Sequence, residues 1–431
     1  MTTPSPRLET IDRRGPPAII AATKMRDRLL VTSTGIQACA LAVILALGGS
    51  FSAGFARSDE PLKIATEPFL PPTGPYAVGT HEYLWVDQRR PDPFMKDTKI
   101  RRHLIVRVWY PAQAVPGAAK APYIRDVNEF AEKSDYRAFG NVKTNAVTDA
   151  PLAKSKAPFP VLVYQPGGGT QRFISTFETE ELASHGYVVV AADHPGFSET
   201  ARFPDGVAFK ADQHVAPPQK GDFRDDVDKN WAWLNDEVFP TWTADASYTL
   251  DKIEELNKTS GQIFYKQLDL SRMGMFGWSF GGATSVEMSI DDPRVKAVID
   301  QDGQLFGEAR KKATSRPLMM MHHGGEDKAD KLEQEAVLKE LIAQTEAWDR
   351  GLIEHSTGDR YEVTIAKTQH GNFSDFMLAI PQNPAELDAR RAHAIVIAYT
   401  LAFFDKYLRG QDSDLLKGPS AKYPEVTFSK K

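Results

Sequence analysis

The feature that most constrains the fold of this chain is the stretch at residues 273–282, Met-Gly-Met-Phe-Gly-Trp-Ser-Phe-Gly-Gly. An apolar run ends there in Gly-x-Ser-x-Gly, which is typical of a sharp turn from a strand into a helix with a serine at its tip. Gly277 and Gly281 leave room where side chains would collide with the turn. A helix that begins near Phe280 would aim free backbone N–H groups at the serine. The pattern predicts Ser279 as a nucleophile, and the alternative is a glycine-rich turn with a solvated serine.

Apolar runs that alternate with helical patterns predict a mostly parallel central sheet with helices on both faces. The expected strands are residues 104–110, 159–164, 187–192, 273–277, 295–299, 316–322 and 362–365. The expected helices are residues 173–185, 244–256, 281–289, 331–350 and 389–408. This order predicts an α/β-hydrolase fold with a helical and loop insertion at residues 197–257, before the nucleophile strand. The insertion either covers the active site or is a peripheral excursion, and the sequence leaves both open.

The N-terminal segment differs in character from the rest of the chain. Residues 36–47 form a short apolar run, with basic residues before it and small residues after it. This pattern is typical of a secretory signal peptide, and the run is short for a membrane span. We therefore expect an export segment at residues 1–56 and one secreted or periplasmic domain at residues 57–431; the alternative is an uncleaved N-terminal membrane anchor. Residues 74–80 are expected to form a turn-rich segment that leads into the domain.

Composition excludes several classes of function. The chain has 431 residues, a net charge of −5 and no basic stretch interleaved with aromatic residues, so we expect no nucleic-acid partner. The only cysteine, Cys39, lies in the N-terminal apolar run, which leaves no thiolate nucleophile or thiolate metal ligand in the expected domain. The adjacent His322 and His323 lack the spacing and the carboxylate partners of a zinc site, so we expect neither a metal nor another cofactor. Nothing in the sequence indicates the oligomeric state.

A serine nucleophile needs a base that takes its proton and an acid that orients the base. Among ten histidines, His370 is the best candidate base, because it follows the last expected strand on a glycine-containing loop. Asp302 follows the first strand after the nucleophile helix, and Glu326 and Asp327 follow the next strand. Position alone does not choose between Asp302 and that pair. Asp300 is expected to point elsewhere.

Acyl transfer also needs two backbone N–H groups that bind the developing oxyanion. Phe280, directly after the nucleophile, would supply one, and Gly168, in the glycine-rich loop after an early strand, would supply the other. A plain glycine turn is the alternative for that loop, and a phosphate-binding loop is excluded because no Lys-Ser/Thr follows. Trp278, Gly167 and Phe373 are the expected residues of the substrate pocket.

Several motifs between residues 74 and 376 share one resemblance. They are Gly-Pro-Tyr at 74–76 with Val-Gly-Thr at 78–80, Val-Trp-Tyr-Pro at 108–111, the elbow at 277–282 with Ala283, Asp302 followed by Phe306, and His-x-Asn-Phe-x-Asp-Phe at 370–376. Together they resemble the platelet-activating-factor acetylhydrolases of the plasma and intracellular type II group, and the last motif is the most specific. The resemblance implies a Ca²⁺-independent serine esterase. It also implies Asp302 as the acid, with Ser279, His370, Phe280 and Gly168 in the roles given above.

Two departures from that family affect the expected substrate. Trp278 stands where the family usually has histidine, and the loop before Thr170 is Pro-Gly-Gly-Gly in place of His-Gly-x-Gly. We expect an enzyme that cleaves carboxylic esters through an acyl-serine, and the resemblance implies short or oxidised sn-2 acyl groups of phospholipids, with transient contact to a membrane surface. The alternatives are a general carboxylesterase of dienelactone-hydrolase or polyester-hydrolase type and, with less support, a non-catalytic envelope binding protein.

Overall fold

The computed structural model describes residues 64–131, 134–200, 202–209, 223–325, 332–380 and 383–431. Several expectations lie outside these residues and are therefore not addressed by the structure. They are the export segment at residues 1–56, Cys39, and the acid candidates Glu326 and Asp327.

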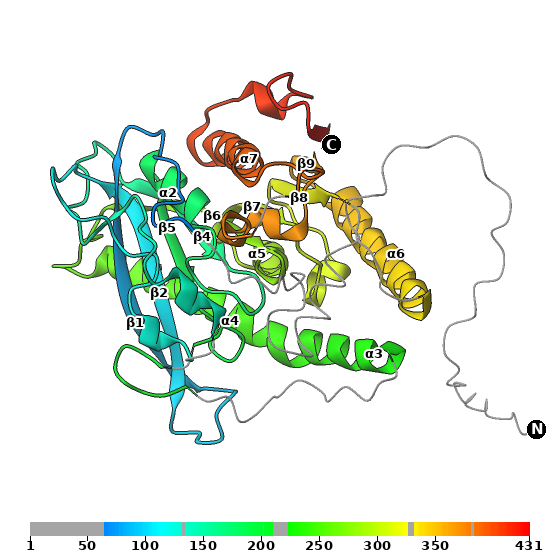
Figure 1. Cartoon of the computed structure of the whole chain (residues 1–431), viewed down its shortest axis with the longest axis horizontal. Coiled ribbons are helices and arrows are strands. Elements are labelled where there is room, and N and C mark those ends of the chain that lie inside the picture. Colours follow the sequence, from blue (N-terminus) through cyan, green and yellow to red (C-terminus); the bar gives the residue numbers. More distant parts are fainter. Residues whose placement is uncertain (1–63, 132–133, 201, 210–222, 326–331, 381–382) are drawn as a thin grey trace, which may run out of the picture. The chain divides into compact units, whose positions relative to one another are not determined.

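One mixed sheet organises the described residues (Figure 1). Its strands are β1 (Ala77–Pro91), β2 (Arg101–Ala112), β3 (Val147–Thr148), β4 (Phe159–Gln165), β5 (Val188–Ala192), β6 (Leu268–Trp278), β7 (Val295–Gln301), β8 (Leu318–Gly324), β9 (Arg360–Ala366) and β10 (Val426–Lys430). The strand order is β10-β9-β8-β7-β6-β4-β5-β2-β1-β3. The six strands from β9 to β5 are parallel, whereas β2 pairs antiparallel with β5 and with β1, and β10 pairs antiparallel with β9.

Helices cover both faces of the sheet. The α-helices are α2 (Thr176–Ser184), α3 (Phe223–Trp233), α4 (Phe239–Lys258), α5 (Phe280–Asp291), α6 (Leu332–His355) and α7 (Ala389–Arg409). Short 3₁₀ helices lie at Val127–Glu129, Asp135–Phe139, Gly307–Arg310, His370–Phe373, Asp375–Leu378 and Asp414–Leu416. The α2 and α7 helices share one apolar core with one face of the sheet, and α4, α5 and α6 pack on the other face. The expected fold class, an α/β-hydrolase with a mostly parallel sheet, is confirmed.

The first strand of the sheet, β1, was not predicted from the sequence. Residues 74–80 were expected to form turns, but β1 runs from Ala77 to Pro91 and pairs antiparallel with β2, with a register shift between Asp87 and Pro91. Polar side chains make this strand hard to recognise in the sequence. Glu82 lies opposite Arg107, and the two side chains form an ion pair of 2.6 Å. A buried ion pair interrupts the apolar pattern by which a strand is recognised in a sequence. The short edge strand β10 was also not predicted.

The insertion at residues 197–257 packs against the helix that follows Ser279. Its described part contains α3, a π-helical turn at Leu234–Val238, and α4. Aromatic side chains of the insertion, Trp233, Phe239 and Trp242, form an apolar cluster with Phe280. The described part of the insertion therefore contacts the first residue of α5, and its role as a cover of the active site stays a prediction.

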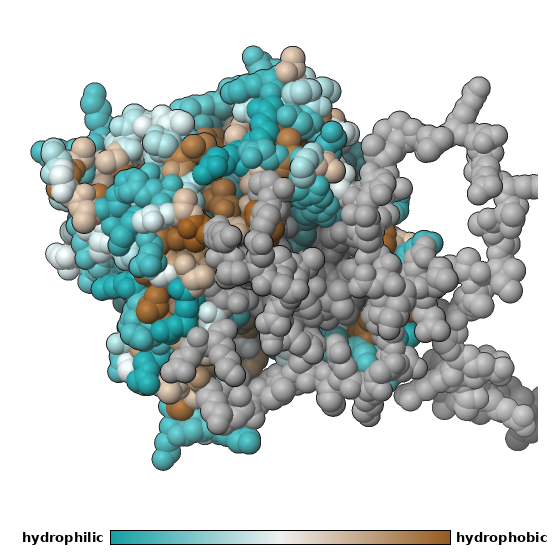
Figure 2. Space-filling model, in the orientation of Figure 1, coloured by the Kyte–Doolittle hydropathy of each residue, from teal (hydrophilic) through white to brown (hydrophobic). Residues whose placement is uncertain are grey.

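Apolar side chains are largely inside the described part of the molecule. Among the described residues, Leu70 and Val115 are the large hydrophobic side chains that are exposed. Figure 2 shows mainly hydrophilic residues on the part of this face that grey atoms do not hide, with apolar residues in small areas between them. Within the described ranges, no helix has the length and apolar character needed to cross a membrane.

Candidate active site

Ser279 lies at the turn from β6 into α5. Its φ of 57° and ψ of −124° fall in a region that residues with a side chain rarely occupy. The Ser279 backbone N–H donates to Gln301 O at 2.9 Å, which ties the turn to the end of β7. Backbone strain that the surrounding structure holds in place is common at functional sites, and it is the geometry of a nucleophile elbow.

The two glycines that flank Ser279 allow this turn to pack closely. A Cβ atom on Gly277 would lie 2.6 Å from Gln165 O and 2.5 Å from the carbonyl carbon of Gly281. A Cβ atom on Gly281 would overlap the carbonyl oxygen of Gln165 outright. Both contacts are with backbone atoms, so no side-chain movement could relieve them. The Gly-x-Ser-x-Gly spacing is therefore a steric requirement of the contact between β4 and α5.

The structure brings Asp302 and His370 together from different parts of the chain. Asp302 follows β7, His370 begins the 3₁₀ helix after β9, and His370 Nδ1 lies 2.7 Å from Asp302 Oδ2. Burial acts to raise the pKa of Asp302, but His323 and His370 hold it well below its usual range. An ionised carboxylate only accepts hydrogen bonds, so the proton lies on Nδ1 of His370. The other ring nitrogen, Nε2, is then the atom that can accept a proton.

Asp300 points toward the elbow and not toward His370. Its Oδ1 accepts the Gly303 N–H at 2.7 Å and lies directly beside Gly282 in α5. Burial, with a smaller contribution from Asp302, raises the pKa of Asp300 to about 8. Its carboxyl group is therefore mainly protonated at neutral pH, and its surroundings differ from those of Asp302 two residues later.

His323 is a polar neighbour of the site that the sequence analysis missed. Its Nδ1 lies 2.7 Å from Asp302 Oδ2, and its backbone N–H donates to Asp302 Oδ1 at 3.1 Å. The sequence pattern favoured His370 as the base, and the histidines of β8 were considered as metal ligands. The signal that could have identified His323 is its place at the carboxyl end of β8, next to the end of β7.

The neighbouring His322 has a different environment. Its ring is buried, which lowers its pKa. Across the ranges that the structure describes, no three His, Cys, Asp or Glu side chains are grouped so that they could hold a metal ion.

The two predicted oxyanion donors lie next to each other. A Cβ atom on Gly168 would be 3.7 Å from Cβ of Phe280. Phe280 is the first residue of α5, where a backbone N–H has no acceptor within its own helix. Thr170 donates to Gly167 O from its backbone N–H and its hydroxyl, at 3.0 and 2.7 Å, and so fixes the turn around Gly168.

The three residues expected in the substrate pocket differ in position. Trp278 joins the elbow to the histidine loop, because its Nε1 donates to His370 O at 3.0 Å and its ring centroid is 5.0 Å from that of His370. Gly167 lies against the Trp278 ring: a Cβ atom added to Gly167 would be 2.8 Å from an atom of that ring. Phe373 is fully buried in the main core. Contact of these residues with a substrate stays a prediction.

Comparison with known proteins shows which families and proteins this chain resembles. The sequence pattern of the family described as platelet-activating factor acetylhydrolase, isoform II, matches residues 66–421. A protein of Arthroderma benhamiae named probable 1-alkyl-2-acetylglycerophosphocholine esterase is 26% identical over 292 residues, which cover 62% of this chain and 66% of that protein. The platelet-activating factor acetylhydrolase of Cavia porcellus is 24% identical over 371 residues, covering 78% of this chain and 77% of that protein.

A solved structure also resembles this chain. The ferulic acid esterase from Streptomyces cinnamoneus superimposes with a TM-score of 0.64 and 28% identity, over 84% of this chain and 99% of that one. These relatives are named as esterases or acetylhydrolases, in agreement with the enzyme class expected from the sequence.

Proposed function

Because this chain belongs to the platelet-activating factor acetylhydrolase isoform II family, we propose that it is a serine ester hydrolase that uses Ser279, His370 and Asp302. The observation that carries the proposal is the 2.7 Å contact between His370 Nδ1 and Asp302 Oδ2. It joins an acid and a base that are 68 residues apart, in a chain whose strained elbow carries a serine. Local sequence alone does not produce this contact between the acid and the base.

The mechanism follows from the roles of these side chains. Nε2 of His370 takes the proton of Ser279 as Oγ attacks the ester carbonyl, while Asp302 stabilises the imidazolium that forms. The N–H groups of Phe280 and Gly168 bind the oxyanion of the tetrahedral intermediate. His370 then protonates the departing alcohol, which leaves an acyl-Ser279. A water molecule, deprotonated by His370, attacks that acyl group and releases the acid.

We propose short or oxidised sn-2 acyl groups of phospholipids as the substrate class. The names of the relatives from Arthroderma benhamiae and Cavia porcellus support an acetylated glycerophosphocholine as the type of substrate. A second candidate is a broader carboxylesterase, favoured by the likeness to a ferulic acid esterase over 99% of that chain. The substrate is thus a phospholipid in the first case and a small-molecule ester in the second, and contact with a membrane surface would be transient.

The function is tested by comparing esters that differ in acyl chain and in alcohol. We would measure turnover of p-nitrophenyl esters from acetate to palmitate, of 2-acetyl and long-chain phosphatidylcholines, and of methyl ferulate. Ser279→Ala and His370→Ala are the controls, and each should lower kcat by about 10³-fold or more. Activity on short esters and the acetyl phospholipid supports the phospholipid class. Activity on simple esters or ferulate alone supports the carboxylesterase, and wild-type rates equal to those of Ser279→Ala exclude both.

We also propose that the protein is exported, to the periplasm or the medium. The support is the basic, apolar and small-residue pattern at residues 1–56. Fractionation of cells that express the full chain, with N-terminal sequencing of the recovered protein, tests this proposal. A product cleaved near residue 57 supports a signal peptide, an uncleaved product in the membrane fraction supports an anchor, and an uncleaved product in the cytoplasm contradicts export.

A further inference from the structure

The loop that carries Gly168 is held at both ends by two consecutive residues that follow β5. Before the loop, the side-chain amide of Gln165 lies 3.0 Å from Nε2 of His194. After the loop, Arg172 donates to Asp193 from its backbone N–H and from Nη1, at 2.6 and 2.5 Å. All four side chains are fully buried. We call residues 166–171 the oxyanion loop, and its position depends on these two attachments to the neighbouring strand.

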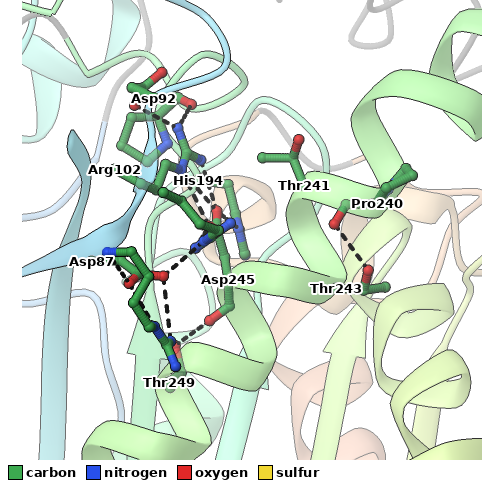
Figure 3. Close-up of polar contacts among 12 residues, drawn as sticks. Asp87, Asp92, Arg102, His194, Pro240, Thr241, Thr243, Asp245 and Thr249 are labelled. Carbon is green, nitrogen blue, oxygen red and sulfur yellow. Dashed lines mark hydrogen bonds and ion pairs between the residues drawn. The ribbon is translucent and has the colours of Figure 1, made fainter. Parts of the chain in front are cut away.

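His194 is fixed in turn by the inserted helix α4. Its Nδ1 lies 3.1 Å from Oδ2 of Asp245, whose carboxylate also accepts Arg102 Nη2 at 2.7 Å (Figure 3). Arg90 Nη2 donates to the other oxygen of Asp245 at 2.8 Å. Burial acts to raise the pKa of Asp245, but Arg102 and His194 hold it well below its usual range. Asp245 is therefore an ionised, fully paired acceptor that fixes the orientation of the His194 ring.

The same helix contacts the elbow through Trp242. The Trp242 ring stacks on the His194 ring with centroids 3.8 Å apart, and it meets Phe280 edge-on at 4.8 Å. One helix of the insertion thus contacts both the histidine attached to the oxyanion loop and the residue that bears the other proposed N–H donor. This double contact would keep the two donors in a constant relative position.

We propose that His194, held by Asp245, is a positioning residue that fixes Gln165 and thereby the oxyanion loop, so that the Gly168 N–H meets the developing oxyanion. The inference rests on the proposed function, because it assigns a role within that reaction. Oxyanion donors act mainly in the transition state, and a displacement of about 1 Å can cost about 10²-fold in rate. Loss of the His194–Gln165 contact should therefore lower kcat and leave KM nearly unchanged.

The test removes the polar contact and keeps the packing. His194→Phe retains a ring that can stack on Trp242, and Gln165→Leu retains the volume of the side chain without its amide. Replacement of Asp245 is less informative, because it would leave Arg102 buried without its main carboxylate partner and would destabilise the fold. His185→Phe is the matched control: this half-buried histidine bonds Glu181 and Thr73 and has no contact with the oxyanion loop.

The measurements separate catalysis from folding. Circular dichroism and thermal melting report the folded state, and titration with a fluorophosphonate counts competent Ser279 sites. We would then measure kcat per titrated site and KM on p-nitrophenyl acetate, and the affinity of an alkyl boronic acid, which forms a tetrahedral adduct with the serine. The set comprises wild type, both single variants, the double variant and His185→Phe.

The expected result is a loss of about 10- to 100-fold in kcat per site for each single variant, with KM within about threefold and a parallel loss of boronate affinity. The double variant should lose no more than the larger single loss, because both changes break the same contact. Values of kcat within twofold of wild type, or single losses that multiply in the double variant, would overturn the inference. If His194→Phe does not fold, Gln165→Leu carries the test alone. Failure of the proposed function would differ, because wild type would then neither hydrolyse esters nor react with the fluorophosphonate.

Discussion

Asp300 and Asp302 lie two residues apart and have opposite surroundings. Asp302 accepts hydrogen bonds from two imidazoles, whereas Asp300 accepts a backbone N–H beneath the elbow. The chain leaves β7 between them, and Asp302 has a φ of 60°, which turns the later side chain toward the histidine loop. Proximity in sequence therefore gives these carboxylates no common function.

Conversion of each aspartate to asparagine tests this distinction. Asp302→Asn should lower kcat by about 10³- to 10⁴-fold, because the amide cannot stabilise the imidazolium or hold the proton on Nδ1 of His370. Asp300→Asn should cost less than about tenfold, because the native carboxyl is already largely protonated at pH 7 and an amide oxygen can accept the Gly303 N–H. The measurement is kcat per titrated serine at pH 7. Equal losses in the two variants would contradict the assignment of the acid.

His323 is expected to contribute by holding the Asp302 carboxylate. His323→Phe removes the side-chain bond and keeps the backbone N–H bond, so we expect a loss of about tenfold in kcat, equivalent to about 1.4 kcal/mol. His322→Gln is the control, because no hydrogen bond between that ring and Asp302 occurs among the described contacts. Its kcat should remain within about threefold of wild type. If His323→Phe lowered kcat no more than the control does, His323 would have no role in the reaction.

Among the elements, α2 is fastened to β7 by a buried carboxylate. Both oxygens of Glu178 lie 2.9 Å from Gln301 Nε2, and burial raises the pKa of Glu178 to about 7, although Thr400 and Gln301 act to lower it. The usual pKa of a glutamate side chain is 4.5, so between pH 4.5 and 7 the folded chain binds more protons at this group than the unfolded chain does. Stability from this group is therefore lost as pH rises through that interval, by up to about 1.4 kcal/mol per pH unit.

Glu178→Gln should remove this pH dependence. Relative to wild type, the variant should gain about 2 kcal/mol in the free energy of unfolding between pH 5 and pH 8. Urea unfolding at the two pH values provides the measurement. Glu181→Gln is the control, and its effect on the free energy of unfolding should change with pH in the opposite direction. Burial acts to raise the pKa of Glu181, but bonds from His185 and Thr73 hold it below its usual value. A Glu178→Gln effect that is the same at both pH values would show that the native carboxyl is ionised throughout.

At the scale of the whole molecule, β10 stabilises one edge of the sheet, although this strand lies outside the residues that the family pattern matches. β10 pairs with β9, Arg391 bonds Glu425, and the backbones of Lys431 and Arg360 bond each other. The family pattern ends at residue 421, before this strand. β10 covers the hydrogen-bonding edge of β9, and an uncovered edge promotes aggregation.

Removal of residues 422–431 should lower the melting temperature by about 5 °C or more and increase aggregation on heating, because it uncovers β9. A chain that lacks only Lys431 is the control: it loses the two backbone bonds to Arg360 but keeps β10 and its register with β9. Differential scanning calorimetry and light scattering measure the two effects. If the truncated chain had the same melting temperature as the control, β10 would contribute nothing to the stability of the sheet.

The sequence by itself predicted the parts of this protein whose signals are local. The buried strands and the elbow are recognisable because each is a continuous run, and the glycines on either side of Ser279 meet backbone that any such turn would meet. The order of serine, acid and histidine followed from the order of those runs. The acid itself was left open by position, and the resemblance to a family selected it.

Only the tertiary structure decided which polar groups meet. His323 reaches Asp302 because β7 and β8 are neighbours in the sheet, and β1 was missed because its buried Glu82 is compensated by Arg107 from another strand. Likewise, nothing near His194 in the sequence indicates that Asp245, 51 residues later, will orient it. A buried polar side chain is stable only with its partner, and when that partner comes from a distant segment the sequence carries no local trace of the pair.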